Sequence, residues 1–313
     1  MLADDTQQRV DSRLKKPASD MPVTGPRITQ EGPAERGSFD VWIEAGRVDR
    51  RYWRDLWHYR ELFLILTWRN LAVRYKQTVA GAAWAVLQPA LAVIVMTFIF
   101  EHLARLPASA DAPYAIMVAA GVLPWQFFSA SLASGSQSIV ADAALISKVY
   151  FPRLLIPGSA LAAALADFLI ACAVLAAVMV YYEFAPTLRV LALPALICLA
   201  ILAALGPSLI VSALAVRYRD FRFVVPLVIQ FGLYLSPVAY SSALVHDRLG
   251  YQWFLVYCLN PMTGVIDAFR WAVLGTPLVD GVGFGISMTV AAVLLGVGLR
   301  YFRSVERSFA DVI

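Results

Sequence analysis

Long apolar runs separated by polar stretches dominate the chain beyond residue 79. A transmembrane helix needs about 20 mostly apolar residues. Six runs meet this length, near residues 80–100, 113–133, 157–182, 189–216, 223–240 and 282–302. The pattern predicts an all-α integral membrane protein with six transmembrane helices per chain.

Directly before the first run, residues 64–79 have the pattern of an amphipathic helix. At ~3.6 residues per turn, the apolar face carries Leu64, Trp68, Leu71, Ala72, Tyr75 and Val79. The opposite face carries Arg69, Asn70, Arg74, Lys76 and Gln77, and Val73 is the one residue out of place. Such a helix lies in the membrane interface with its basic face toward anionic headgroups. We therefore expect an N-terminal interfacial helix where the membrane domain begins.

The first part of the chain is polar. Residues 1–40 contain no apolar run that could act as a signal peptide, and proline and glycine recur through them. A segment of this kind cannot bury a hydrophobic core. We expect residues 1–53 to form a disordered cytoplasmic tail and residues 54–313 to form the membrane domain.

Basic residues beside the spans orient the chain, because cytoplasmic flanks carry an excess of Lys and Arg. With the N-terminus in the cytoplasm, the cytoplasmic flanks carry Arg69, Arg74, Lys76, Lys148, Arg153, Arg217, Arg219, Arg222, Arg300, Arg303 and Arg307. The opposite flanks carry Arg105, Arg189, Arg248 and Arg270. This asymmetry predicts a multi-pass protein of the cytoplasmic (inner) membrane with both termini in the cytoplasm.

The connection between the second and third predicted spans is too long to be a simple turn. Its core, residues 139–149, reads as a short cytoplasmic helix with Asp142 and Lys148 exposed. Phe151-Pro152 closes this helix, because the residue before a proline disfavours helical geometry.

The external connection, residues 241–282, is rich in aromatic side chains, which suits the membrane interface. Within it, residues 262–274 predict a short helix that dips back into the outer leaflet. Asn260-Pro261 is its start signal and Gly275 its stop signal.

Composition supports a membrane protein and excludes some other classes. Hydrophobic residues make up 60% of the chain and charged residues 15%, whereas a soluble domain carries roughly 25% charged residues. The net charge of +4 therefore reflects topology, and we expect no nucleic-acid partner. Cys172, Cys198 and Cys258 are far apart and indicate neither a disulfide framework nor a metal site.

Motifs for catalysis or ATP binding are missing from the sequence. No segment matches the phosphate-binding pattern G-x-x-x-x-G-K-[ST], so any ATP site must belong to another chain. The histidines (His58, His102 and His246) lie outside the apolar runs, which leaves the serines in the spans without an imidazole base. Asp167 lies inside a run, where a carboxylate needs a partner. It either contacts a proton or substrate, or forms a structural hydrogen bond.

Aromatic and amide side chains recur in three of the spans. They are Trp84, Gln88, Trp125, Phe127, Phe128, Gln230, Phe231 and Tyr234. Aromatic rings offer apolar faces to the C–H groups of sugars, and amides can hydrogen-bond hydroxyls. A sugar-conducting path would use both, and ordinary helix packing is the alternative. Arg69, Arg74 and Lys76 likewise either anchor to lipid phosphates or guide an anionic substrate.

Four stretches carry a resemblance to a known family. They are Arg74-Tyr75-Lys76-Gln77-Thr78-Val79 with Gly81 and Trp84, Leu123-Pro124-Trp125 with Phe127-Phe128, Leu259-Asn260-Pro261-Met262, and Glu306 with Phe309-Ala310-Asp311-Val312-Ile313. In this order they resemble the permease (transmembrane) subunits of polysaccharide-exporting ABC transporters, which export O-antigen, teichoic acid or capsule. The resemblance covers about residues 54–313, and its first and last stretches are its most specific parts.

The resemblance implies an assembly. Two copies of the chain would form a homodimer around a channel, in contact with membrane lipids. Two separate ATPase subunits would bind ATP and Mg, so that this chain holds no cofactor and is a transport subunit, not an enzyme. The substrate would be a polysaccharide linked to a polyprenyl diphosphate, similar to O-antigen.

The resemblance also implies roles for particular residues. The substrate channel would be lined by Trp84, Gln88, Trp125, Phe128, Gln230, Phe231 and Tyr234. The interfacial gate helix, residues 64–79, would act through Trp68, Arg69, Arg74, Tyr75 and Lys76. The coupling helix that docks into the ATPase, residues 139–150, would use Asp142, Lys148, Tyr150 and Arg153. The external gate segment, residues 241–275, would use Asn260, Pro261, Asp267 and Arg270.

Three other function classes stay open. An ABC permease for a drug or small lipid shares the architecture, but the aromatic motifs are not expected in it. A membrane-embedded glycosyltransferase should cluster carboxylates or histidines at one interface, which this chain does not. A secondary transporter would usually show inverted repeats and more intramembrane charge.

Overall fold

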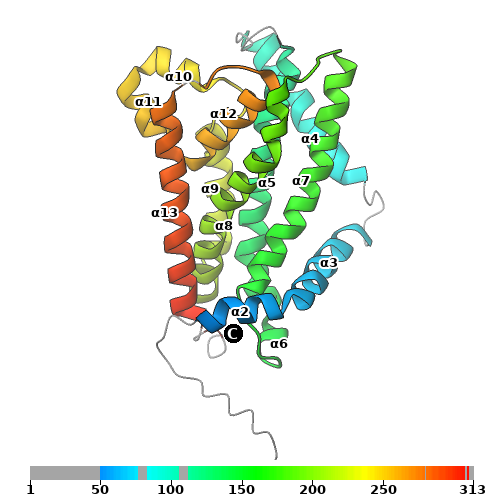
Figure 1. Ribbon diagram of the computed structural model, residues 1–313, viewed down its shortest axis with the longest axis vertical. Helices are drawn as coiled ribbons and strands as arrows, with labels where there is room; N and C mark the ends of the chain where they lie inside the picture. Colours follow the sequence, from blue (N-terminus) through cyan, green and yellow to red (C-terminus); the bar gives the residue numbers. More distant parts are fainter. Residues whose placement is uncertain (1–49, 77–82, 106–111, 279, 307–308, 310–313) are drawn as a thin grey trace, which may run out of the picture. The chain divides into compact units, whose positions relative to one another are not determined.

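The structure confirms the all-helical class for the part of the chain that it describes. This computed structural model describes residues 50–76, 83–105, 112–278, 280–306 and 309 (Figure 1). Features predicted at residues 1–49, 77–79 and 310–313 lie outside them. The helices are α2 (Arg50–His58), α3 (Arg60–Lys76), α4 (Ala83–Thr97), the π-helix η1 (Phe98–Leu103), α5 (Tyr114–Ala141), α6 (Ala143–Ile146), α7 (Leu155–Tyr181), the 3₁₀-helix η2 (Leu188–Ala192), α8 (Leu193–Arg217), α9 (Phe221–Tyr234), α10 (Ser242–Leu249), α11 (Tyr251–Tyr257), α12 (Pro261–Leu274) and α13 (Gly281–Val305).

Five helical stretches among the described residues are long and apolar enough to cross a membrane. They are Ala83–Leu103, Tyr114–Ala141, Leu155–Tyr181, Leu188–Arg217 and Gly281–Val305. They correspond to five of the six predicted spans, with ends shifted by a few residues. The chain is therefore a multi-pass membrane protein.

The span predicted at 223–240 is shorter in the structure. α9 has 14 residues and ends at Tyr234. Beyond it, the Asn260 amide donates to the carbonyl of Leu235 (3.1 Å) and to Ser236 Oγ (2.8 Å), which holds this stretch in a turn. Pro237 follows and disfavours helical geometry before it. The described chain therefore has five helices of spanning length, not the predicted six, because the apolar run outlasts its helix.

α5 lies at the centre of the described helices, with α4, α7, α8, α9 and α12 as neighbours. Its first half, residues 114–125, is buried throughout. α8 and α13 cross beside it in direct backbone contact: a Cβ on Gly298 would lie 2.5 Å from the carbonyl oxygen of Gly206. Small residues permit such close approach of two helices in a membrane.

The predicted helix at 262–274 is confirmed as α12, together with both of its end signals. Asn260 Oδ1 accepts a hydrogen bond from the backbone N–H of Met262 (3.0 Å), and Pro261 occupies the first turn. Gly275 ends the helix in the left-handed conformation at φ 72°. α12 is packed against α5, α8 and α13. Its position in the outer leaflet stays a prediction.

The single short helix predicted at 139–149 is wrong. α5 continues to Ala141, and α6 contains only residues 143–146. The break falls at Asp142, whose backbone lies at φ −101°, ψ 20°. Its side chain is only 11% exposed, contrary to expectation, because it accepts a hydrogen bond from Arg69 (2.6 Å).

The boundary predicted between tail and membrane domain also moves. α2 begins at Arg50, so residues 50–53 are helical although they were expected to be disordered. The physical reason is a contact distant in sequence: the Tyr52 hydroxyl donates to the Glu306 carboxylate (3.2 Å). The Arg303 guanidinium also lies 4.5 Å from the centre of the Tyr52 ring.

Candidate functional site

The amphipathic helix α3 lies against α7 (Figure 1). Leu66 is buried on its protein-facing side, whereas Leu64 (63% exposed) and Trp68 (71% exposed) point away from the protein. The Asn70 amide donates to Ser159 Oγ on α7 (3.2 Å). Part of the predicted apolar face is thus free to enter lipid, while a second face is fixed to the bundle.

The last turn of α3 supplies the partners that Asp167 was expected to need. The Arg74 guanidinium and the Tyr75 hydroxyl donate to the two carboxylate oxygens of Asp167. Burial, followed by the hydrogen bond to Asp167, raises the pKa of Tyr75 to about 12, so the hydroxyl stays protonated at neutral pH. The side chains of Arg74 (39% exposed) and Asp167 (25% exposed) stay accessible.

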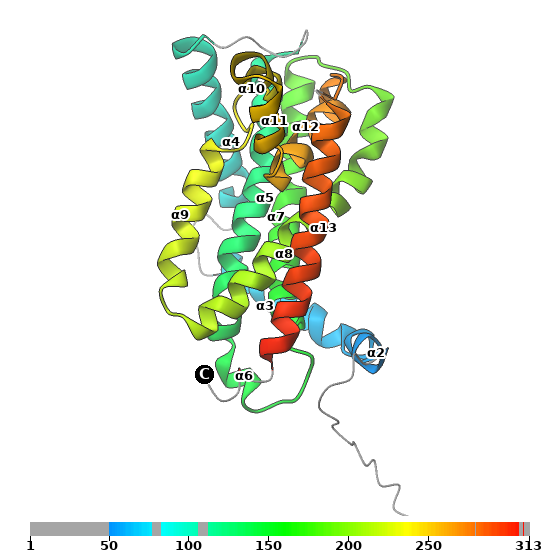
Figure 2. The ribbon, with the colours of Figure 1, turned by 90° about the vertical axis from the view of Figure 1, so that its left-hand side faces the viewer.

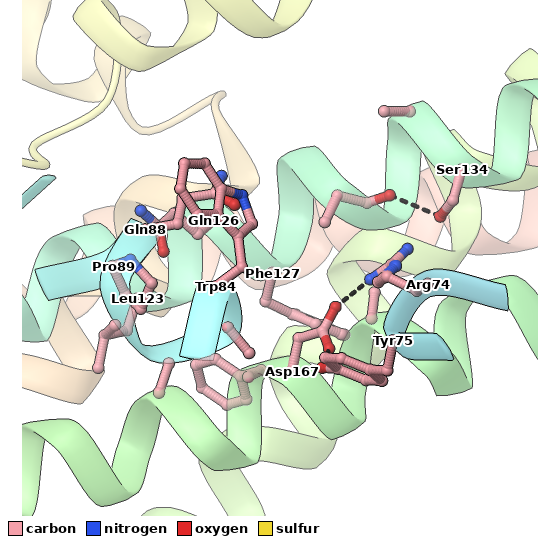
Figure 3. A pocket seen from close by; sticks show the side chains of 16 residues that line it. Arg74, Tyr75, Trp84, Gln88, Pro89, Leu123, Gln126, Phe127, Ser134 and Asp167 are labelled. Atoms are coloured by element: carbon pink, nitrogen blue, oxygen red, sulfur yellow. Dashed lines mark hydrogen bonds and ion pairs between the residues drawn. The ribbon is translucent and has the colours of Figure 1, made fainter. Parts of the chain in front are cut away.

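This ion pair lies at a cavity of about 380 Å³ between α3, α4, α5 and α7, which we call the charged cavity. Figure 3 shows Arg74 and Tyr75 turned toward Asp167, with Trp84 and Gln88 of α4 farther along. Its lining consists of Arg74, Tyr75, Trp84, Ala85, Gln88, Pro89, Leu123, Gln126, Phe127, Ala130, Ala133, Ser134, Ala164, Asp167, Phe168 and Ala171. Two predicted channel residues and two predicted gate residues therefore meet in one cavity.

The other predicted channel residues lie elsewhere. Gln230, Phe231 and Tyr234 are exposed on α9. Trp125 is buried and its ring lies 5.5 Å from that of Phe128. The Trp125 ring lies against Gly232 of α9, where a Cβ would lie 2.6 Å from it. Neither ring lines a cavity described here.

α4 and α9 both leave broad apolar faces exposed. Figure 2 shows the two helices on the same side of the described bundle, and both contact α5. Ile94 (62% exposed) on α4 and Phe231 (63% exposed) on α9 are typical of these faces. Gln88 and Gln230 are exposed on the same two helices. The amides make this surface more polar than a purely lipid-facing one.

The predicted coupling residues divide into two groups. Lys148 and Tyr150 are exposed and line a surface cleft of about 270 Å³ with residues 146, 147, 149, 151 and 153. Asp142 is bound to Arg69, and the Arg153 guanidinium donates to the carbonyl oxygen of Glu306. Arg153 lines the same cleft, so Lys148, Tyr150 and part of Arg153 are accessible to another protein.

A junction joins α2, the start of α7 and the end of α13. Glu306 belongs to a stretch that carries the family resemblance, but its partners could not be predicted from the sequence. Glu306 is the centre of this junction: its carboxylate accepts from the backbone N–H of Arg153 (2.9 Å) and from the Tyr52 hydroxyl. Burial raises the pKa of Glu306, and the hydrogen bonds from Arg153 and Tyr52 oppose this effect. Residues 254 positions apart meet here, which helical periodicity cannot reveal.

The residues predicted to form the external gate act as links within the bundle. The Asp267 carboxylate accepts from Ser242 Oγ (2.6 Å). Arg270 is only 4% exposed and donates to the carbonyls of Val238 (2.9 Å) and Tyr240 (2.7 Å). Together with the bonds from Asn260, these contacts fix residues 235–242 to α12. A gating role for this segment stays a prediction.

These observations define the class of the protein: a multi-pass helical membrane protein with an amphipathic helix fixed beside a charged cavity. A family model described as "ABC-2 type transporter" matches residues 61–274, so the chain belongs to the ABC-2 type transporter family. It is similar to an O-antigen export system permease protein RfbA of Klebsiella pneumoniae, with 29% identity over 81% of this chain and 95% of that protein. A second relative of the same name from Myxococcus xanthus is 27% identical over 83% of this chain and 98% of that protein.

Proposed function

We propose that this chain is the channel-forming permease of an ATP-driven exporter that moves lipid-linked polysaccharide, similar to O-antigen, across the cytoplasmic membrane. The curated relatives that it matches along nearly their whole length are named as O-antigen export permeases. Two ATPase subunits bind ATP and Mg, and two copies of this chain enclose the conduit.

The observation that carries this proposal is the composition of the exposed α4 and α9 faces. An amide such as that of Gln230, exposed on α9, is unfavourable in hydrocarbon unless it finds hydrogen-bond partners. A second copy of the chain, or a hydrated glycan between two copies, supplies such partners. The exposed aromatic rings of Phe231 and Tyr234 on α9 give a sugar apolar surfaces along which to slide.

The exposed coupling residues support an ATPase partner at the end of the bundle that carries α2 and α6. Lys148 and Tyr150 line a cleft that is open to another protein. We place this end, and both termini, in the cytoplasm, because the flanking Lys and Arg are concentrated there. Reversing the charge of Lys148 should weaken binding of the ATPase.

An ABC permease for a small lipid is the second candidate. The charged cavity, at about 380 Å³, has the size of a small-molecule site and cannot enclose a long glycan within one chain. Under our proposal the glycan passes between copies. Export of a glycan therefore requires that the α4 and α9 faces of two copies meet at a dimer interface. Transport of a small lipid through the charged cavity does not require this.

Cysteine crosslinking tests the arrangement. In a background without the three native cysteines, Phe231→Cys and Leu91→Cys should crosslink two copies in membranes. Leu169→Cys on α7, which is 50% exposed, is the matched control and should not. In parallel, deletion of the gene should abolish the surface polysaccharide, and the wild-type chain should restore it. Crosslinking only at Leu169→Cys, or an unchanged polysaccharide, would contradict the proposal.

A further inference from the structure

A second cavity continues the charged cavity along the same helices. It has a volume of about 290 Å³ and lies between α4, η1, α5 and α7. Both cavities are lined by Pro89 and Leu123, so they adjoin. Val93, Ile94 and Leu175 are typical of the lining of this second cavity, which we call the apolar cavity.

The two cavities form one track, since their residues follow in order along the helices. On α7, Asp167 and Ala171 line the charged cavity, and Val174 and Val178 continue into the apolar one. α5 and α4 show the same division, on either side of Leu123 and Pro89 respectively. One end of the track therefore presents a guanidinium together with hydroxyl and amide groups. The rest presents mostly hydrocarbon, with Thr97, His102 and Tyr182 at its far end.

This combination fits an anionic amphiphile with a long hydrocarbon chain. Among the residues that line the charged cavity, Arg74 is the one cation and Asp167 the one carboxylate, so the charges of the lining balance. The amphiphile's head can reach Arg74 because neither partner of the ion pair is fully buried. A guanidinium also binds phosphate oxygens in a bidentate fashion, as it binds a carboxylate.

We propose that the track binds an isoprenoid diphosphate, and that the diphosphate takes the place of Asp167 on Arg74 and Tyr75. The hydrocarbon chain then lies in the apolar cavity. This inference rests on the proposed function, because the isoprenoid diphosphate is the lipid end of the exported substrate. No covalent step is involved.

Asp167 is a positioning residue in this scheme. Its carboxylate accepts from Arg74 and Tyr75 and holds both side chains at the cavity. Once displaced, its negative charge stays beside the diphosphate and weakens binding, since like charges at short range repel. A site that must release its ligand after each transport cycle benefits from this competition.

The binding test uses the complex of this chain with its ATPase, in nanodiscs of zwitterionic lipid, and farnesyl diphosphate as the probe. Asp167→Asn keeps the shape of the side chain and removes its charge, so affinity should rise about 10-fold. Arg74→Gln should lower affinity by about the same factor. Asp167→Glu should resemble the wild type, and farnesol, which lacks the diphosphate, should bind all four proteins equally.

A purely structural role for Asp167 makes the opposite prediction. Asp167→Asn would then loosen Arg74 and leave affinity unchanged or lower, which would overturn the proposal. Inorganic diphosphate binding as tightly as farnesyl diphosphate would also overturn it, because the track would then serve a free anion. Competition by phosphatidylglycerol at equal concentration would assign the track to bulk lipid instead.

Two tryptophan substitutions on α7 test whether the apolar cavity binds the hydrocarbon chain. Val178→Trp fills the apolar cavity and should weaken farnesyl diphosphate about 10-fold, with no effect on inorganic diphosphate. Val180→Trp, two residues away and 78% exposed outside the cavity, should bind as the wild type does. Equal behaviour of the two variants would remove the apolar cavity from the site.

The two proposals fail separately. If the gene deletion abolishes the surface polysaccharide but Asp167→Asn binds no more tightly, the exporter assignment stands and the exchange at Arg74 is wrong. If the deletion leaves the polysaccharide unchanged while the binding results hold, the track binds an isoprenoid diphosphate for another purpose.

Discussion

Arg270 and Arg74 are the same kind of residue in opposite situations. Arg270 is 4% exposed and donates to backbone carbonyls of three residues, including Met117 on α5. Arg74 is 39% exposed on its side chain and donates to one carboxylate at an accessible cavity. A guanidinium that satisfies fixed carbonyls holds helices together, whereas one that faces a single acid can exchange its partner. Burial and the number of hydrogen-bond partners therefore distinguish the structural Arg270 from Arg74, which we propose binds a ligand.

The largest loss of stability should follow from removing the hydrogen bonds that Arg270 donates. Arg270→Gln removes the donors to Val238 and Tyr240, which leaves the buried carbonyl of Val238 and the half-buried carbonyl of Tyr240 without this partner. We expect the chain to lose about 3 kcal/mol or more of stability, seen as a lower thermal unfolding temperature in detergent. Arg248→Gln, on an exposed residue of α10, is the control and should unfold like the wild type. Equal unfolding of both variants would show that Arg270 is not a structural link.

Alanine substitutions at two separate glycines should give a smaller difference in unfolding temperature. A Cβ on Gly121 would lie 2.3 Å from the carbonyl oxygen of Val238 and 3.0 Å from Arg270 Nη2. Gly121→Ala therefore pushes α5 away from Val238 and Arg270. We expect a loss of about 1–3 kcal/mol. At Gly158, beside α3, a Cβ would meet only the Phe63 ring at 3.5 Å. Gly158→Ala should therefore leave the unfolding temperature unchanged. The reverse order of the two variants would contradict the comparison.

The smallest effect on stability should come from breaking the accessible ion pair between Arg74 and Asp167. Arg74→Gln removes one accessible ion pair, and such pairs contribute about 1 kcal/mol or less. Export should nevertheless fall strongly, because the charged cavity loses its cation. Surface polysaccharide and unfolding temperature, measured on the same variant, separate the two properties. A large loss of stability would place Arg74 with Arg270 as a structural residue.

Local signals in the sequence predicted local structure well. α12 could be placed with both ends, because Asn260, Pro261 and Gly275 each act on the backbone beside them. The end of α9 could not, because the apolar run continues and the turn at Leu235 depends on an amide 25 residues away.

The candidate site shows the same limit. Burial of a carboxylate in a span predicted that Asp167 needs a partner, but not which one. Arg74 lies 93 residues earlier in the chain, on a helix whose basic residues could equally have faced lipid. The charged cavity follows only once α3 is known to lie against α7.

The junction at Glu306 bears on the order in which the protein can be completed. Tyr52 and Arg153 leave the ribosome long before Glu306 does, yet both depend on it for their hydrogen bonds. Glu306 must therefore be synthesised before α2 and the start of α7 can be joined through it. A chain truncated before residue 306 would keep its long apolar helices but lose the junction at Glu306. The junction therefore forms only in copies whose synthesis has passed Glu306.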